Sequence, residues 1–288
     1  MSKQSDLIKG SLLALLAFFC MAVFGLLTKE AYRTGSAIWV SFITYAVATI
    51  GIGALILPKG LQFLKSEKMD YLIGRAVFGT AASFLYMLSL KYISIVNSTL
   101  LLNTAPIFIP LLMVFWLKRK VPKEAWIAVA VGFLGIAIII KPGSSLFTDP
   151  GNLLGFSSGL CLAVAYLLIK LLTDTDPGLR IIFYYFAIGM VLQLPLLFFA
   201  GSFPAHQAFY YAVLSGLTLL LAQFALVKAY TYAEAYQIGI YQYASVVFVG
   251  LIEWLLWGSI PTMTDFMGML LVAIAGILII RNNNKVTS

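Results

Sequence analysis

The stretch that decides the fold covers residues 92–120 and reads YISIVNSTLLLNTAPIFIPLLMVFWLKRK. Its apolar part, residues 93–117, is long enough to cross a bilayer as one helix, since a crossing takes about 20 residues. It carries Asn97 and Asn103, whose amide donors and acceptors would go unpaired against lipid. The stretch therefore predicts a transmembrane helix that lines a polar space. Asparagines that join two neighbouring helices by hydrogen bonds would produce the same pattern.

Four polar or proline residues of this helix recur at helical spacing and are predicted to share one face: Thr99, Asn103, Pro106 and Pro110. Each proline removes a backbone hydrogen bond and loosens the helix. We therefore expect this face to border the polar space and the helix to permit bending.

The same stretch has a counterpart in the second half of the chain. Aligned so that Tyr92 falls on Tyr232, it matches YAEAYQIGIYQYASVVFVGLIEWLLWGSI, residues 232–260, and Phe108 falls on Phe248. A second match relates residues 20–29 to residues 161–170, with six identities in ten positions. Because the matches occur in the same order in both halves, the chain is interpreted as a duplication.

The composition indicates an integral membrane protein. Of the 288 residues, 61% are hydrophobic and 10% charged, whereas a soluble domain has about 45–50% apolar and 25% charged residues. Ten apolar segments are predicted to cross the membrane: 10–28, 37–57, 72–90, 93–117, 125–140, 153–172, 181–200, 208–230, 236–257 and 266–280.

Five spans in each half determine the predicted fold class. Because five is odd, the second half must enter the membrane upside down relative to the first. The fold is thus expected to be an all-α integral membrane protein of ten transmembrane helices, arranged as two inverted five-helix repeats, residues 1–148 and 149–288. In such transporters the substrate site lies where the repeats meet, near the middle of the membrane.

The distribution of basic residues predicts the orientation. Fifteen lysines and arginines, Arg75 among them, are assigned to the side that holds both termini, and four, including Lys29 and Lys91, to the other side. Because cytoplasmic loops carry an excess of positive charge, both termini are expected in the cytoplasm. The net charge of +8 is explained by these loops and does not indicate a nucleic-acid partner.

Several segments resemble the drug/metabolite transporter superfamily, specifically its EamA-type ten-span exporters. These segments are Leu88–Tyr92, Asn97–Pro106, Ile107–Leu117, Ala229–Tyr232 and Phe248–Gly258, together with Lys29 and Lys170, which close the first span of each half. The chain departs from the family pattern at Leu117-Lys118 and Gly258-Ser259, where Gly-Glu is usual. The resemblance covers nearly the whole chain and implies a protein of the bacterial inner membrane that exports amino acids or related metabolites.

Motifs of enzymes and ATP-driven pumps are absent from the sequence. It contains no HExxH, no Cys/His metal-ligand spacing and no Gly-rich nucleotide loop, so no metal, cofactor or catalytic role is expected. We expect a secondary-active or facilitative carrier that moves a small polar or amphipathic metabolite by alternating access, by export or exchange. The alternatives are a membrane scaffold or sensor without net transport, and a lipid flippase.

The candidate substrate site lies between the fourth and ninth spans. Its expected first contacts are polar residues within apolar spans: Asn97, Asn103, Gln237 and Tyr243, with Tyr185 and Tyr241 as further candidates. Amides and phenols together suit a zwitterion or an organic cation, because amides bond a carboxylate or amine and aromatic faces attract cations. Tyr230, near the end of a span, is instead expected in the interfacial aromatic belt.

Glu253 and Lys29 are the candidate coupling or gating residues. Glu253 is the only carboxylate well inside a predicted span, and a charge at a helix centre costs about 2.5–3.5 kcal/mol on insertion scales. One interpretation is a proton-coupling site, with protons as the coupling ion. The other is an interfacial carboxylate paired with a basic side chain such as Lys91. Lys29 either contacts a substrate carboxylate or extends to the membrane surface.

Overall fold

The computed structural model describes residues 3–93, 95–142, 151–258 and 260–282. These residues form helices and connections, with no strand among them. Among the described residues, ten helical segments are long and apolar enough to cross a membrane, from Ser5–Tyr32 to Met263–Arg281, which confirms all ten predicted spans. The predicted boundary between the repeats, at residues 148 and 149, lies outside the described residues.

The helices of the first half are α1 (Lys3–Tyr32), α2 (Ala37–Ile56), α3 (Met69–Ser89), α4 (Ile95–Leu102), α5 (Ala105–Phe115) and α6 (Lys123–Ile140). Those of the second half are α7 (Gly151–Leu172), α8 (Gly178–Gln193), α9 (His206–Tyr230), α10 (Ala235–Gly239), α11 (Tyr243–Trp257) and α12 (Met263–Asn282). Short 3₁₀ helices at Leu57–Lys59 and Leu61–Leu64 follow α2, and others at Leu194–Phe199 and Ile240–Gln242 extend α8 and α10.

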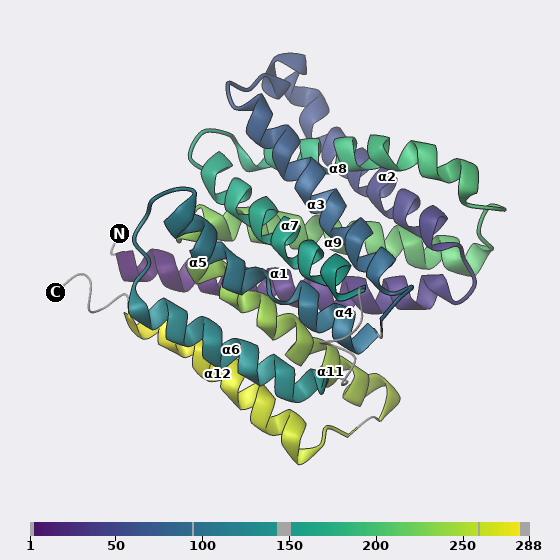
Figure 1. The fold of residues 1–288 in the computed structure, drawn as a ribbon. Coiled ribbons are helices and arrows are strands. Elements are labelled where there is room, and N and C mark those ends of the chain that lie inside the picture. The colour runs from purple at the N-terminus through teal and green to yellow at the C-terminus, as the bar shows by residue number, and fades with distance from the viewer. Residues whose placement is uncertain (1–2, 94, 143–150, 259, 283–288) are drawn as a thin grey trace.

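Helices of one half pack mainly on helices of the other half. Helix α1 lies along α9, α3 along α7 and α8, α2 along α8 and α9, and α6 along α12. Figure 1 shows α6 and α12 side by side at one edge of the bundle, and α1 begins on the side where α12 ends. This set of neighbours is unchanged when the two halves are exchanged, as expected for a duplicated architecture.

The close packing of α6 against α12 depends on glycines. A Cβ atom on Gly135 of α6 would lie 2.8 Å from the Gly268 carbonyl oxygen of α12, and one on Gly268 would lie 2.5 Å from the Gly135 carbonyl oxygen. Small residues allow the two backbones to approach this closely. The fifth and tenth spans therefore pack against each other, backbone close to backbone.

The fourth and ninth spans are each interrupted, whereas the sequence predicts one continuous helix for the fourth. The break between α4 and α5 falls at Asn103 and Thr104, and the break between α10 and α11 falls at Ile240–Gln242. Pro106 explains the first break, because it has no N–H to donate to the carbonyl of Leu102, four residues earlier. At both places the backbone dihedrals stay right-handed helical, so each span remains one helical segment with an irregular turn at its break.

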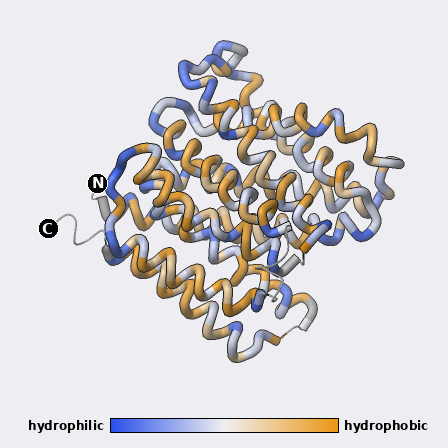
Figure 2. The backbone as a smooth tube through the Cα atoms, in the orientation of Figure 1, coloured by the Kyte–Doolittle hydropathy of each residue, from blue (hydrophilic) through white to orange (hydrophobic). Residues whose placement is uncertain are grey.

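Hydropathy follows the same architecture. Figure 2 shows apolar residues along the lengths of the helices and hydrophilic residues gathered at the connections and helix ends. Ion pairs join elements at these ends, including Arg119 with Glu234 at 3.4 Å and Lys141 with Asp265 at 3.0 Å. This distribution is typical of a bundle whose length crosses a bilayer.

Candidate functional site

The two helix breaks meet each other inside the bundle. Gln242, at the second break, donates from Nε2 to the Asn103 side-chain oxygen at 3.3 Å and, over a longer 3.5 Å, to the Leu102 carbonyl. That carbonyl is the one that Pro106 leaves without its helical donor. Asn103 in turn donates to the Thr99 carbonyl at 2.9 Å. A side chain of the second half therefore bonds to the opened backbone of the first half.

Neighbouring glycines make room for these breaks. A Cβ atom on Gly159 of α7 would lie 2.6 Å from the Leu101 carbonyl oxygen, at the end of α4. At Gly239 an added Cβ would collide with the side chain of Ile109 from α5. Both broken segments are thus held tightly by their neighbours, and in transporters such paired interruptions mark the substrate site.

The predicted substrate contacts have different surroundings in the structure. Asn97 is buried in α4. Gln237 accepts a hydrogen bond from the Glu234 backbone N–H at 2.9 Å and thereby caps α10. Tyr243 is buried, with its ring against Gly132 of α6 and its hydroxyl without a hydrogen-bond partner. Of the four, Asn103 lies directly at the meeting point of the breaks.

The remaining two predicted tyrosines take no part in the contact between the breaks, although Tyr241 lies within the second break. Tyr241 donates its hydroxyl to Ser11 of α1 at 2.8 Å and joins two helices. Tyr185 of α8 pairs its hydroxyl with that of Tyr45 in α2 at 2.8 Å, and its ring packs against Phe186. Tyr185 therefore belongs to a second polar cluster.

This second cluster surrounds Arg75 of α3, which is only 3% exposed. The guanidinium carbon lies 3.7 Å from the centre of the Tyr185 ring, and Nη2 donates to Gln223 of α9 at 2.8 Å. Gly79, one turn along α3, accommodates Nη1, because a Cβ atom there would collide with it. Tyr45, Arg75, Tyr185 and Gln223 therefore form one buried cluster.

Assigning Arg75 to the basic residues of the cytoplasmic side was wrong, because the structure buries it among side chains of other helices. Its removal from that count leaves the charge asymmetry intact. An arginine inside a predicted apolar span was a signal in its own right, since ionisable residues within spans mark functional sites. Assigning Tyr230 to the interfacial aromatic belt was also wrong. Its side chain is fully buried, and the centre of its ring lies 6.2 Å from that of Tyr166.

The two candidate coupling residues form one ion pair. Lys29 Nζ, at the end of α1, lies 3.1 Å from Glu253 Oε1 of α11, with side chains 62% and 35% exposed. The partner suggested for Glu253, Lys91, was therefore wrong. A pair with this exposure favours an interfacial link between the two halves, worth no more than about 1 kcal/mol.

A comparison of two substitutions tests the role of this pair. Glu253→Gln removes the carboxylate, and Lys29→Gln removes the same ion pair but keeps the carboxylate. We expect both variants to respond to an imposed pH gradient in reconstituted vesicles as the wild-type protein does, and to lose similar, small amounts of stability. Loss of pH-gradient dependence in Glu253→Gln alone would instead establish Glu253 as the proton-coupling group.

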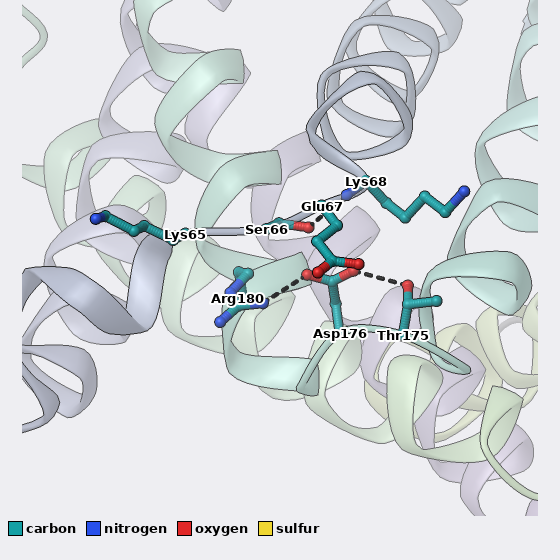
Figure 3. A pocket seen from close by; sticks show the side chains of 7 residues that line it. All are labelled: Lys65, Ser66, Glu67, Lys68, Thr175, Asp176 and Arg180. Atoms are coloured by element: carbon teal, nitrogen blue, oxygen red, sulfur yellow. Dashed lines mark hydrogen bonds and ion pairs between the residues drawn. The ribbon is translucent and has the colours of Figure 1, made fainter.

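A polar pocket of about 390 Å³ lies at the opposite end of the bundle from this pair. It is lined by residues of the connection before α3, of the α7–α8 connection and of the first turn of α8: Lys65, Ser66, Glu67, Lys68, Thr175, Asp176 and Arg180. Figure 3 shows Arg180 and Thr175 both directed at Asp176, at 2.7 and 2.8 Å. Burial opposes ionisation of Asp176, but hydrogen bonds from Ser66, Arg180 and Thr175 outweigh it and lower its pKa.

The residues around this pocket join the two halves of the chain at one end of the bundle. Arg180 also donates from Nε to the Phe63 carbonyl at 2.7 Å, and the Tyr184 hydroxyl donates to the Leu64 carbonyl at 2.9 Å. The second half thereby holds the α2–α3 connection of the first half. We interpret the pocket as part of this contact between the halves.

Comparison with known proteins assigns the architecture. A Pseudomonas aeruginosa pseudopaline exporter, CntI, is 28% identical over 96% of this chain and 98% of its own length. A Vibrio cholerae riboflavin transporter is 25% identical over 82% of this chain and 80% of its own. A Rickettsia bellii S-adenosylmethionine uptake transporter is 23% identical over 86% of this chain and 85% of its own length. A solved crystal structure at 16% identity shares the fold, with a TM-score of 0.80 over 96% of this chain and 98% of that chain.

The ten apolar helices indicate an integral membrane protein, and the relatives with which it is compared are named as transporters. The chain belongs to the EamA-like transporter family, which matches residues 8–141 and residues 149–281 separately. The expected family resemblance is thereby confirmed.

Proposed function

We propose that the protein is a secondary carrier that moves a small polar metabolite across the bacterial inner membrane by alternating access. The observation that carries this proposal is the meeting of the two helix breaks at Asn103 and Gln242. Interrupted helices expose backbone donors and acceptors at membrane depth only where they are buried in protein or line a cavity. The relatives named as exporters and uptake transporters support the same class of activity.

The two halves supply the moving parts in this proposal. The contacts that join them lie at opposite ends of the bundle: Lys29 with Glu253 at one end, and Arg180 with the Phe63 carbonyl at the other. In an inverted arrangement of the repeats, the contacts at one end of the bundle can open while those at the other end stay closed. The region of the breaks is then exposed to one side of the membrane at a time. Alternating access in many carriers arises from such rocking of one repeat against the other.

We further propose that both termini are cytoplasmic. This orientation rests on the excess of lysine and arginine in the connections on the terminal side. In a variant with Cys20 and Cys161 replaced by serine, a cysteine at exposed Thr34 should react with an impermeant maleimide in intact cells. A cysteine at exposed Glu67 should react only after permeabilisation. The reverse labelling pattern would invert the proposed topology.

Comparative metabolomics tests the function itself. Cells that overexpress the protein and cells that carry an empty vector are compared for metabolites in the cytoplasm and in the medium. A carrier should shift the distribution of specific metabolites, and the purified protein in vesicles should transport those same compounds. A lipid redistributed between leaflets would instead indicate a flippase. No shift of any compound, in cells or vesicles, would favour a scaffold or sensor.

A further inference from the structure

The buried guanidinium of Arg75 has no acidic partner in the part of the chain that the structure describes. None of the six ion pairs formed by the described residues includes it. Nη2 bonds to the neutral amide of Gln223, and Nε is buried with no hydrogen-bond partner. A buried charge without a counter-ion is costly to a folded protein, so its retention points to a ligand that supplies the missing charge.

The surroundings fix the direction in which this ligand must approach. The guanidinium stacks on the face of Tyr185, whose hydroxyl is held by Tyr45. Stacking sets the plane of the guanidinium, and its N–H donors point outward within that plane. Of these donors, Nη2 already bonds to Gln223, whereas the Nε–H has no hydrogen-bond partner. A carboxylate oxygen can accept a charge-assisted hydrogen bond from this free Nε donor.

Two further tyrosines complete the site. Tyr230 lies two turns along α9 from Gln223, on the same face of that helix, and the centre of its ring lies 6.2 Å from that of Tyr166. The Tyr230 hydroxyl is buried and has no hydrogen-bond partner, so it is available to donate to an anion. The two rings also supply apolar surface for the remainder of an organic ligand.

We propose that Arg75 binds a carboxylate group of the transported metabolite, with Tyr230 donating to the same group and the tyrosine rings contacting its apolar part. The proposal rests on the proposed carrier function and names its substrate class as organic acids, amino acids included. A carboxylate is favoured over a phosphate ester because one guanidinium balances one negative charge, whereas a phosphate monoester carries about 1.5–2 at pH 7.

Binding of benzoate to the purified protein tests the site directly. Benzoate combines a carboxylate with an aromatic ring, benzamide has the same shape without the charge, and inorganic phosphate supplies the other oxyanion. We expect benzoate to raise Tm in a concentration-dependent manner and the other two to leave it unchanged. Arg75→Lys, which keeps the charge and loses the planar fork, should raise the half-maximal benzoate concentration at least tenfold. Equal stabilisation by benzamide or phosphate, no stabilisation by benzoate, or normal benzoate binding by Arg75→Lys would overturn the proposal.

A pair of matched substitutions separates binding from a structural role. Arg75→Met should fold with an unchanged or raised Tm and no response to benzoate, because it removes an uncompensated buried charge. Arg180→Met should lower Tm, since Arg180 has an ionic partner in Asp176 at 2.7 Å. A fall in Tm for Arg75→Met as large as that for Arg180→Met would show that Arg75 serves the fold, contrary to the proposal.

The metabolite comparison distinguishes failure of this proposal from failure of the carrier function. If wild-type protein shifts metabolites that lack a carboxylate, or Arg75→Met shifts the same acids to the same extent, the carboxylate site is refuted and the carrier stands. If wild-type protein shifts no metabolite, the carrier function fails, and the benzoate measurement still decides whether Arg75 forms an anion site.

Discussion

Gly268→Leu is expected to remove most of the correctly folded protein from the membrane. A Cβ atom at this position would lie 2.5 Å from both the Gly135 carbonyl oxygen and a side-chain carbon of Ile139. A side chain can rotate away, but the Gly135 oxygen belongs to the backbone of α6, so α6 and α12 must separate. Overpacking of this kind costs about 1–3 kcal/mol and occasionally more. The yield of monodisperse protein and its Tm measure the effect.

Gly25→Leu is the matched control for this substitution. Gly25 lies within α1, is exposed, and would meet no other atom within 4 Å through an added Cβ. Because leucine favours a helix over glycine by close to 1 kcal/mol in host peptides, about equal or slightly higher stability is expected. If Gly268→Leu were as stable as Gly25→Leu, the two helices would not be in close contact in the membrane.

Asn103→Ala is expected to weaken transport strongly while the protein still folds. The substitution leaves the Gln242 amide without its Asn103 acceptor and opens the point where the two breaks meet. In a carrier that binds its substrate at Asn103, loss of this polar contact costs about 1–3 kcal/mol of binding, which corresponds to about a 5- to 150-fold rise in the half-saturating substrate concentration. Uptake into vesicles of the compound identified by metabolomics measures the change.

Two controls accompany this prediction. Gln193→Ala removes another buried amide, one that donates only to the Gly189 carbonyl within its own helix, and should affect transport far less. Tyr243→Phe removes a buried hydroxyl without a partner, so it should not destabilise the fold; weaker transport in this variant would show that the hydroxyl meets substrate. Aggregation of Asn103→Ala with normal affinity in the remaining protein would show that Asn103 only joins helices.

Much of the architecture follows from hydropathy, because a span is a local property. Ten spans are recognised within a few residues, since a run of apolar side chains must be buried in lipid wherever it lies. The internal repeat is equally accessible, because finding it only requires comparing one segment of the sequence with another. The inverted arrangement of the repeats, in contrast, remains a prediction from the number of spans.

The details of the site depend on partners far away in the chain. Polarity singles out Asn103, but its partner Gln242 is 139 positions away, and polarity alone favours the neighbouring Gln237 equally well. Hydropathy identifies a membrane span but does not show whether its backbone hydrogen bonds are continuous. The breaks are therefore not predicted, although Pro106 can be read from the sequence. For Glu253, the correct partner Lys29 lies near the other end of the chain, which no spacing rule reaches.

The orientation of the Arg75 side chain likewise depends on residues that are distant in the sequence. It lies within two turns of the start of α3, where a charged side chain commonly reaches the membrane surface. Whether such a side chain reaches outward or inward is decided by the helices packed around it. Here Gly79, Tyr185 and Gln223 provide space, a stacking surface and an acceptor in the interior.

The burial of Arg75 also breaks the symmetry of the duplicated chain. The alignment of the two halves that matches Phe84 with Phe224 places Ser215 of α9 opposite Arg75. Ser215 is fully buried and accepts a hydrogen bond from Thr28 at 3.3 Å, so this position in the second half carries no charge. Two equivalent halves would accept a ligand in either of two opposite poses. A single off-centre cation permits only one, so the acidic end of a bound metabolite would face α3 throughout the transport cycle, whichever side of the membrane is open.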